Sequence, residues 1–308
     1  MVRTRTECSR SEQRVPEVAR NIMGAVLNFF TLTYIVSWIF FIAWAVVSGP
    51  TASMTSERAV LATPLLLIGV FAPALVALAL TFRADGRAGT EALIRRAVEW
   101  PGGARWYLFA LGYMAAIKLA AAALHRIVTG AWPPFGQETV LIMAGAIVVS
   151  TPVQAGEEIG WRGYALPRLA NRVGLPVASI VLGVIWASWH LPFFFIPRAD
   201  TFGQSFPLYL LSVTAISVAM AWLYWRSNGS LLLTMMLHAA INNTKDIVPS
   251  AASPTTSSFA LNGSLVAWLT AALLWICAVY FLIQMRGARL EHGSRAVEVR
   301  EIPTSAAV

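Results

Sequence analysis

The feature of this sequence that most restricts its fold is a series of about eight apolar segments, each close to 20 residues long. A helix of about 20 apolar residues crosses the hydrocarbon core of a bilayer. Only 12% of the residues are charged and 57% are hydrophobic, unlike a soluble globular domain. The sequence therefore predicts an all-α integral membrane protein, a bundle of about eight transmembrane helices. The segments lie near residues 25–48, 59–82, 106–128, 138–160, 175–196, 205–225, 229–248 and 263–285.

Basic residues are concentrated in alternate connections between these segments. With a cytoplasmic N-terminus, the inner segments hold 18 of the 23 Lys and Arg residues, and the outer loops hold only Arg58 and Arg198. Short cytoplasmic loops retain positive charge, so we expect both termini to be cytoplasmic. We expect a membrane domain over residues 25–286, with tails over 1–24 and 287–308. The excess of 21 arginines over two lysines suggests a GC-rich genome and hence a bacterial plasma membrane.

Charge and cysteine content narrow the possible partners. The net charge of +8 does not indicate a nucleic-acid partner, because the basic residues lie between apolar segments instead of clustering on a polar domain. Cys8 lies in the polar N-terminal tail and Cys277 in an apolar segment, so neither a disulfide nor a metal pair is expected. The first apolar run is too long for a signal-peptide core, and we expect no cleaved signal.

Two carboxylates and an arginine interrupt the fourth apolar segment, in the sequence Glu157-Glu158-Ile-Gly-Trp-Arg162-Gly. Ionisable residues at membrane depth are costly and usually functional. Residues four apart share a helix face, so Glu158 and Arg162 can pair, while Glu157 is left free to turn toward the bundle interior. Burial disfavours the charged form of a carboxylate, which suits a general base at neutral pH. Taken alone, the cluster equally fits paired charges where a helix leaves the membrane.

Two later apolar segments carry the motifs Trp186-Ala-Ser-Trp-His190 and His238-Ala-Ala-Ile-Asn242. Trp186 can pack against the imidazole of His190 one turn away and fix its orientation. His238 and Asn242 share one helix face, and their N–H groups form a plausible oxyanion hole. For each motif alone, hydrogen bonding between transmembrane helices is the alternative. The predicted helix starts place His190 about 22 Å and His238 about 12 Å from the same side, which is a mismatch in depth.

The three motifs in this order resemble the CPBP family of intramembrane proteases, which comprises the CAAX prenyl protease type II and bacteriocin-processing (Abi) proteins. The resemblance rests on Glu-Glu with Arg four residues on, aromatic-xxx-His and His-xxx-Asn, and covers about residues 140–248. It implies a bundle of eight helices whose conical catalytic cavity opens to the cytosol and partly to lipid. The second motif often begins with Phe, and Trp186 stands there in this chain.

Carried over by motif, the resemblance implies a hydrolytic site. Glu157 and His190 would position and activate water, while His238 and Asn242 would hold the oxyanion. The other Glu and the Arg of the first motif would support the site or hold the substrate, a membrane-associated or lipidated peptide or protein. The implied site residues are Glu157, Glu158, Arg162, His190, His238 and Asn242.

A metal cofactor is possible in this arrangement. Family members are often named metalloproteases, and Glu157, His190 and His238 could offer ligands to zinc. The sequence has no His-Glu-x-x-His motif, and a free base with an amide oxyanion donor needs no metal. We therefore favour a site without a cofactor.

Two other classes of function remain open. Intramembrane Glu and His residues also relay protons or bind cations in transporters, which predicts inverted repeats or broken helices in corresponding halves. The sequence shows neither, and its polar residues gather in the fourth to seventh segments. A noncatalytic immunity or scaffold protein that retains a protease fold is the second alternative.

Overall fold

The computed structural model describes residues 5–49, 55–250 and 257–290, and within them all regular secondary structure is helical. Seven helical segments of this part are long and apolar enough to cross a membrane. The prediction of an all-α, multi-pass membrane protein is therefore confirmed. The seven segments are Met23–Ser48, Glu57–Val98, Ala104–Thr129, Val140–Val173, Leu175–Phe195, Phe206–Arg226 and Leu265–Gln284.

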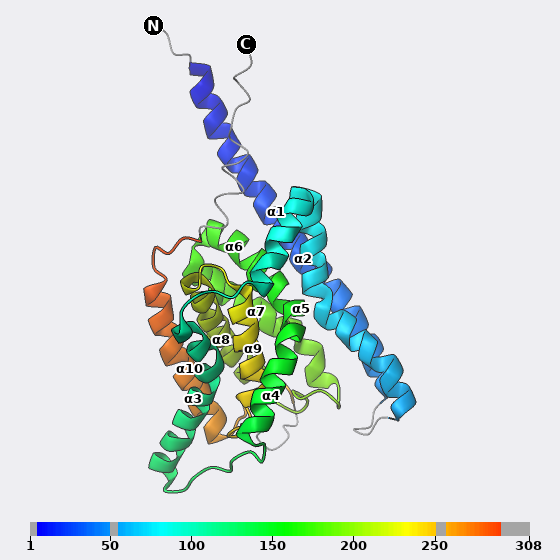
Figure 1. Cartoon of the computed structure of the whole chain (residues 1–308), viewed down its shortest axis with the longest axis vertical. Helices are drawn as coiled ribbons and strands as arrows, with labels where there is room; N and C mark the ends of the chain where they lie inside the picture. The colour runs from blue at the N-terminus through cyan, green and yellow to red at the C-terminus, as the bar shows by residue number, and fades with distance from the viewer. Residues whose placement is uncertain (1–4, 50–54, 251–256, 291–308) are drawn as a thin grey trace.

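The helices run up and down through one bundle, with α1 and α2 packed side by side along one flank (Figure 1). The first turns of α1 and the last turns of α10 lie at the same end. Residues 291–308, most of the predicted C-terminal tail, lie outside the described residues. The helices are α1 (Arg5–Ser48), α2 (Ser56–Val98), α3 (Ala104–Thr129), α4 (Val140–Ser150), α5 (Ala155–Glu158), α6 (Leu166–Val173), α7 (Leu175–Trp189), α8 (Phe206–Arg226), α9 (Leu231–Thr244) and α10 (Leu265–Gln284).

Helix α2 is longer than the sequence predicted. Residues 83–98 were expected to belong to a basic loop, but they continue the helix after a sharp kink at Gly86, whose φ of 65° favours glycine. The last turns of α2 pack against the bundle through Leu93, which is buried. The basic residues of this segment therefore sit on an ordered helical arm.

Helix α9 is shorter than predicted. The apolar segment 229–248 forms a helix of only 14 residues, so it is not among the seven long segments. The helix begins where the hydroxyl of Ser230 accepts a hydrogen bond from the backbone N–H of Leu233. Apart from Met236, Asn242 and Asn243, its residues are buried. A central position surrounded by other helices lets this helix be shorter than the bilayer is thick.

The loop after α9 is tied to the bundle by a buried lysine. Lys118 of α3 is almost fully buried and donates a hydrogen bond to the hydroxyl of Ser250. The carbonyl of Ser250 accepts a second hydrogen bond, 2.9 Å long, from the hydroxyl of Ser264. Because Ser264 is the N-cap of α10, these contacts join α3, the loop and the start of α10.

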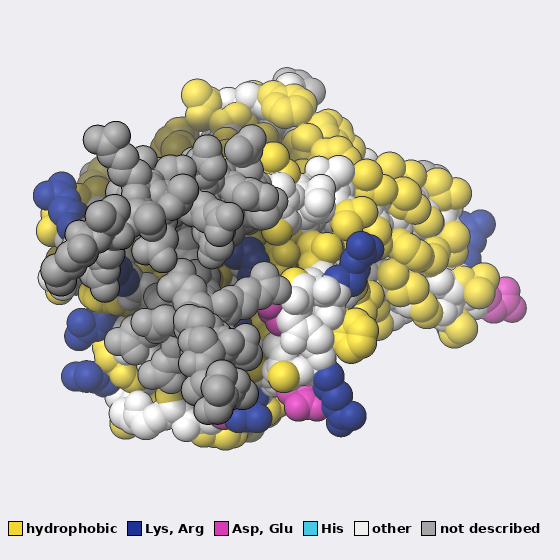
Figure 2. Space-filling view, turned by 90° about the horizontal axis from the view of Figure 1, so that it is seen from above, with side chains coloured by type: hydrophobic (Ala, Val, Ile, Leu, Met, Phe, Trp, Pro, Cys, Tyr) yellow, Lys and Arg dark blue, Asp and Glu magenta, His cyan; other side chains and the backbone are white. Residues whose placement is uncertain are grey.

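The surface is divided into a basic end and an apolar flank. Seen from the end at which α1 begins, Lys and Arg side chains lie around the rim, and hydrophobic side chains cover the extended flank (Figure 2). The exposed residues of α1 include Ile35, Ile39 and Ile42. Such a surface is typical of a protein whose apolar flank faces lipid.

Candidate active site

The Glu-Glu motif is buried in the interior of the bundle, in the middle of a long helical segment. The chain is helical from Val140 to Val173, and it changes from a 3₁₀ turn at Thr151–Gln154 to a π-helix at Ile159–Ala165. Every residue from 156 to 167 is buried. The helical segment therefore continues past residue 160, where the sequence predicted its end. Short π-helical stretches widen a helix and are frequent at functional sites.

Close contact with α2 explains why these charges become buried. A Cβ atom on Gly156 would lie 3.0 Å from the ring of Phe71, and one on Gly160 would lie 2.6 Å from the carbonyl oxygen of Pro73. The two glycines are four residues apart, and this spacing lets membrane helices approach closely. Helix α2 thus covers the segment that carries both carboxylates.

The second carboxylate contacts two other polar side chains in a buried triad. Oε1 of Glu158 lies 3.0 Å from Nη1 of Arg162 and 2.9 Å from Nδ1 of His238. The side chains of Glu158 and Arg162 are completely buried. An ionised carboxylate can only accept hydrogen bonds, so Nδ1 of His238 is the donor to Glu158. Nε2 of His238 then carries a proton only if the ring is an imidazolium ion. The i,i+4 pair predicted from the sequence is present and has a third member.

The first carboxylate has a hydrogen-bond partner, although the sequence predicted that it would be free. The indole N–H of Trp186 donates a hydrogen bond of 2.7 Å to Oε2 of Glu157. Both side chains are buried, with exposed fractions of 4% and 6%. Sequence reasoning treated Trp186 as a packing residue, although its replacement of the usual Phe was the signal that could have revealed a donor.

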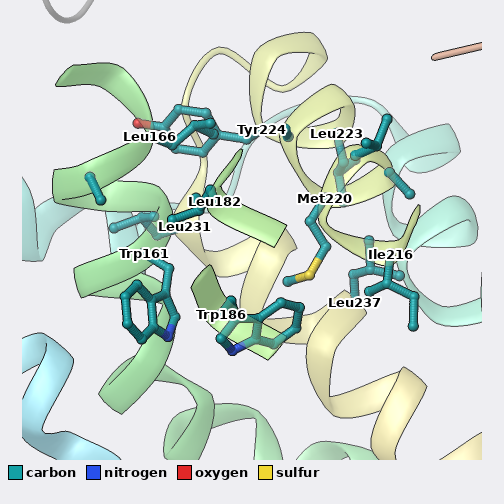
Figure 3. Packing of buried hydrophobic residues seen from close by; sticks show 14 of the residues in the cluster. Trp161, Leu166, Leu182, Trp186, Ile216, Met220, Leu223, Tyr224, Leu231 and Leu237 are labelled. Carbon is teal, nitrogen blue, oxygen red and sulfur yellow. The ribbon is translucent and has the colours of Figure 1, made fainter. Parts of the chain in front are cut away.

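Trp186 also connects the remaining motif residues. Its ring lies under the guanidinium of Arg162, 4.2 Å from the ring centroid. It meets the rings of His190 and His238 edge-on, at centroid distances of 5.8 and 5.2 Å. Trp186 and Trp161, both labelled in Figure 3, belong to the same hydrophobic core. The three motifs therefore meet around one aromatic ring.

These contacts remove the mismatch in depth between the two histidines. Both imidazoles touch the same indole, so they lie at one level. His190 follows the full length of α7, whereas His238 lies in the middle of the short α9. Helix α7 therefore begins about two turns farther from the site than α9 does. After His190 the chain changes to a 3₁₀ helix, Leu191–Phe195, which has Pro192 at its second position.

The imidazole of His190 has a defined orientation. Its Nδ1 lies 2.9 Å from the carbonyl oxygen of Trp186, one turn earlier in the chain. A carbonyl only accepts hydrogen bonds, so Nδ1 carries a proton and Nε2 is left with a lone pair in the neutral ring. His190 is half-buried, in contrast to the buried His238.

The two asparagines of α9 differ in their surroundings. Asn242 is exposed, and its amide makes no hydrogen bond within the described part of the chain. Asn243 donates to the hydroxyl of Ser150 at 2.9 Å and to the carbonyl of Ala239 at 2.8 Å. Asn243 therefore links α9 to α4, whereas the amide of Asn242 is available to another molecule.

The site retains hydrogen-bonding capacity that its own side chains do not use. Oε2 of Glu158 and both Nε and Nη2 of Arg162 are buried without a partner among the described residues. Buried polar atoms of this kind are usually paired in folded proteins.

The described residues do not form a ready-made zinc site. Nδ1 of His190 and of His238 is engaged, which would leave Nε2 of each ring as the metal donor. However, no three His, Cys, Asp or Glu side chains among the residues described here are grouped so that they could hold a metal ion. The arrangement thus does not fit the three ligands considered from the sequence, and no chemical step is derived through a metal.

Comparisons with known proteins find that this segment is similar to proteases. A family model described as type II CAAX prenyl endopeptidase Rce1-like matches residues 137–244, which include all six predicted site residues. CAAX prenyl protease 2 of Methanococcus maripaludis is 32% identical over 98 residues, which cover 30% of this chain and 36% of that protein. The chain thus matches only about a third of the length of this relative.

Proposed function

We propose that this chain is an intramembrane endopeptidase, because residues 137–244 match the type II CAAX prenyl endopeptidase model and carry the three motifs. The observation that carries the proposal is the convergence of three separate motifs around Trp186, which contacts Glu157, His190 and His238. Polar groups that only bridged helices would not need to share one partner.

Glu157 is the general base of the proposed reaction. One of its oxygens is held by the indole of Trp186, and the second has no hydrogen-bond partner in the described part of the chain. As a water oxygen attacks the scissile carbonyl carbon, the carboxylate removes a proton from that water. The peptide C–N bond then breaks, and the protonated carboxyl group returns the proton to the leaving amine.

His190 positions the attacking water. Its Nδ1–H is fixed by the carbonyl of Trp186, which leaves the Nε2 lone pair as an acceptor for a water O–H. A water held by both the imidazole and the carboxylate is oriented before it reacts, which lowers the entropic part of the barrier. The half-buried position of His190 is compatible with access of water.

His238 and Asn242 stabilise the oxyanion. The amide of Asn242 is unengaged and can donate directly. His238 can donate through Nε2 only as an imidazolium ion, since its Nδ1 is committed to Glu158. The proposed role therefore requires a charged His238, and the buried carboxylate of Glu158 supplies the counter-charge.

The proposed substrates are membrane-associated or lipidated peptides or proteins, cleaved without a metal in a bacterial plasma membrane. The name of the relative supports a protease, and the apolar helices support a substrate within or beside the bilayer. The basic end of the bundle supports cytoplasmic termini through the positive-inside rule.

The proposal is tested with purified protein in nanodiscs and a library of lipid-anchored and transmembrane peptides. Glu157→Gln keeps the size and the hydrogen-bond acceptor at Trp186 but removes the base, so cleavage is expected to fall by at least about 10²-fold. Glu91→Gln, on the exposed arm of α2, is the matched control and retains full activity. Equal cleavage by Glu157→Gln and the wild type would refute the mechanism.

A further inference from the structure

We propose that a cavity at the basic end of the bundle, separate from the candidate active site, binds the phosphate headgroup of an anionic lipid. The cavity has a volume of about 350 Å³. Its walls include Arg96 and Glu99 at the end of α2, Trp106 at the start of α3, and Arg226 at the end of α8. None of the six predicted site residues lines it.

The lining is suited to an anion. Two arginines, Arg96 and Arg226, line the cavity together with one acidic residue, Glu99. Glu99 is itself within 4.0 Å of Arg95, which partly neutralises its charge. Guanidinium groups hold phosphate oxygens through parallel N–H donors, a geometry that suits a phosphodiester. Ser230, also in the lining, adds a polar wall at the start of α9.

The position of the cavity favours a lipid as the source of the phosphate. It lies where three membrane-spanning segments end or begin, at Val98, Ala104 and Arg226. Trp106 lies under two guanidiniums, Arg105 at 4.5 Å and Arg226 at 5.7 Å from its ring. Tryptophan and arginine together at a helix end are typical of the headgroup region of a bilayer.

The same cavity wall touches the segment that carries the catalytic carboxylates. Nη1 of Arg96 donates to the phenol oxygen of Tyr224 at 2.6 Å, and Nη2 donates to the carbonyl of Gly163 at 3.2 Å. Gly163 belongs to the π-helix, directly after Arg162. A lipid phosphate bound at Arg96 would therefore be connected, through this arginine, to the backbone of the helix that carries the two carboxylates.

Binding is tested on the full-length protein in detergent by native mass spectrometry during titration with phosphatidylglycerol. Arg226→Gln removes an exposed cation whose recorded contacts are to aromatic rings, so the fold is retained. Apparent affinity is expected to fall about fivefold, because each cation at the surface contributes about 1 kcal/mol to binding of an anionic lipid. Arg172→Gln, an exposed arginine outside the cavity, is the matched control and binds like the wild type.

Three results would overturn the proposal. Equal affinity of Arg226→Gln and Arg172→Gln would show that the cavity is not the site. Displacement of the lipid by equimolar inorganic phosphate would assign the cavity to a soluble ion. Displacement by a peptide with a free C-terminal carboxylate would assign it to a peptide. Because binding is measured without substrate, the result does not depend on the proposed protease activity.

Discussion

Two ion pairs with identical sequence spacing lie in opposite environments in this molecule. On the arm of α2, Arg87 and Glu91 are 2.6 Å apart with side-chain exposures of 88% and 53%. In the motif segment, Glu158 and Arg162 are 3.0 Å apart with no exposure. Water replaces either partner of the first pair, whereas nothing replaces a partner of the second. Spacing predicts that two charges meet, and the surroundings decide what their separation costs.

The largest effect should come from breaking the buried pair. Arg162→Met keeps the length of the side chain but leaves Glu158 without its cation, and we expect a loss of about 3–5 kcal/mol in stability. Thermal or denaturant unfolding in detergent measures this loss, with Arg87→Met as the control. A similar loss of stability in both variants would show that burial does not increase the cost of breaking an ion pair. The double variant Glu158→Gln/Arg162→Met should recover part of the loss.

The exposed Asn242 and the half-buried Asn243 of α9 provide a second comparison. Asn242→Ala should reduce kcat by about 10²–10³-fold, because an oxyanion donor is lost, and should leave the unfolding midpoint unchanged. Asn243→Ala loses one hydrogen bond to Ser150 of α4 and one to the carbonyl of Ala239 in its own helix, and it should lower stability more than kcat. Cleavage rates and unfolding midpoints of both variants decide between these roles, and a reversed pattern would refute the assignment to Asn242.

Removal of the indole N–H donor of Trp186 should reduce kcat by a smaller factor. Trp186→Phe retains a ring but removes the hydrogen bond to Glu157, which at about 1.5–3 kcal/mol corresponds to a fall in kcat of about 10–100-fold with KM unchanged. Benzothienylalanine, an indole isostere without the N–H, should reproduce that loss at position 186. Trp189→Phe is the control, because the N–H of Trp189 has no partner among the described residues. A full kcat with the isostere would reduce Trp186 to a packing role.

The smallest effect belongs to the exposed pair. Arg87→Gln should change stability by less than about 1 kcal/mol, and this change should disappear in high salt because exposed charges are screened. Unfolding of the variant and the wild type at two salt concentrations measures it. A larger, salt-resistant loss would mean that the α2 arm is held by Arg87 and not by its apolar contacts.

The sequence predicted what depends on local spacing and apolar length. The helical membrane fold and the pairing of Glu158 with Arg162 both follow from such patterns. The bond between Glu157 and Trp186 could not be predicted, because it joins residues on helices whose crossing is set by tertiary packing. The burial of the motif likewise depends on α2 approaching Gly160, a contact far from it in sequence. The short α9 was missed because Ile247 and Val248, which follow Lys245 and Asp246, extend the apolar segment beyond the helix.

The two glycines beneath α2 also limit how this protein can diverge. Any side chain at Gly160 would meet the backbone of Pro73, which cannot move aside as a flexible side chain would. In a library of random substitutions selected only for correct insertion, with no demand for catalysis, this position should still return glycine almost alone. Invariance there would record a steric requirement of assembly, although it adjoins the carboxylates and would be mistaken for a mark of chemistry.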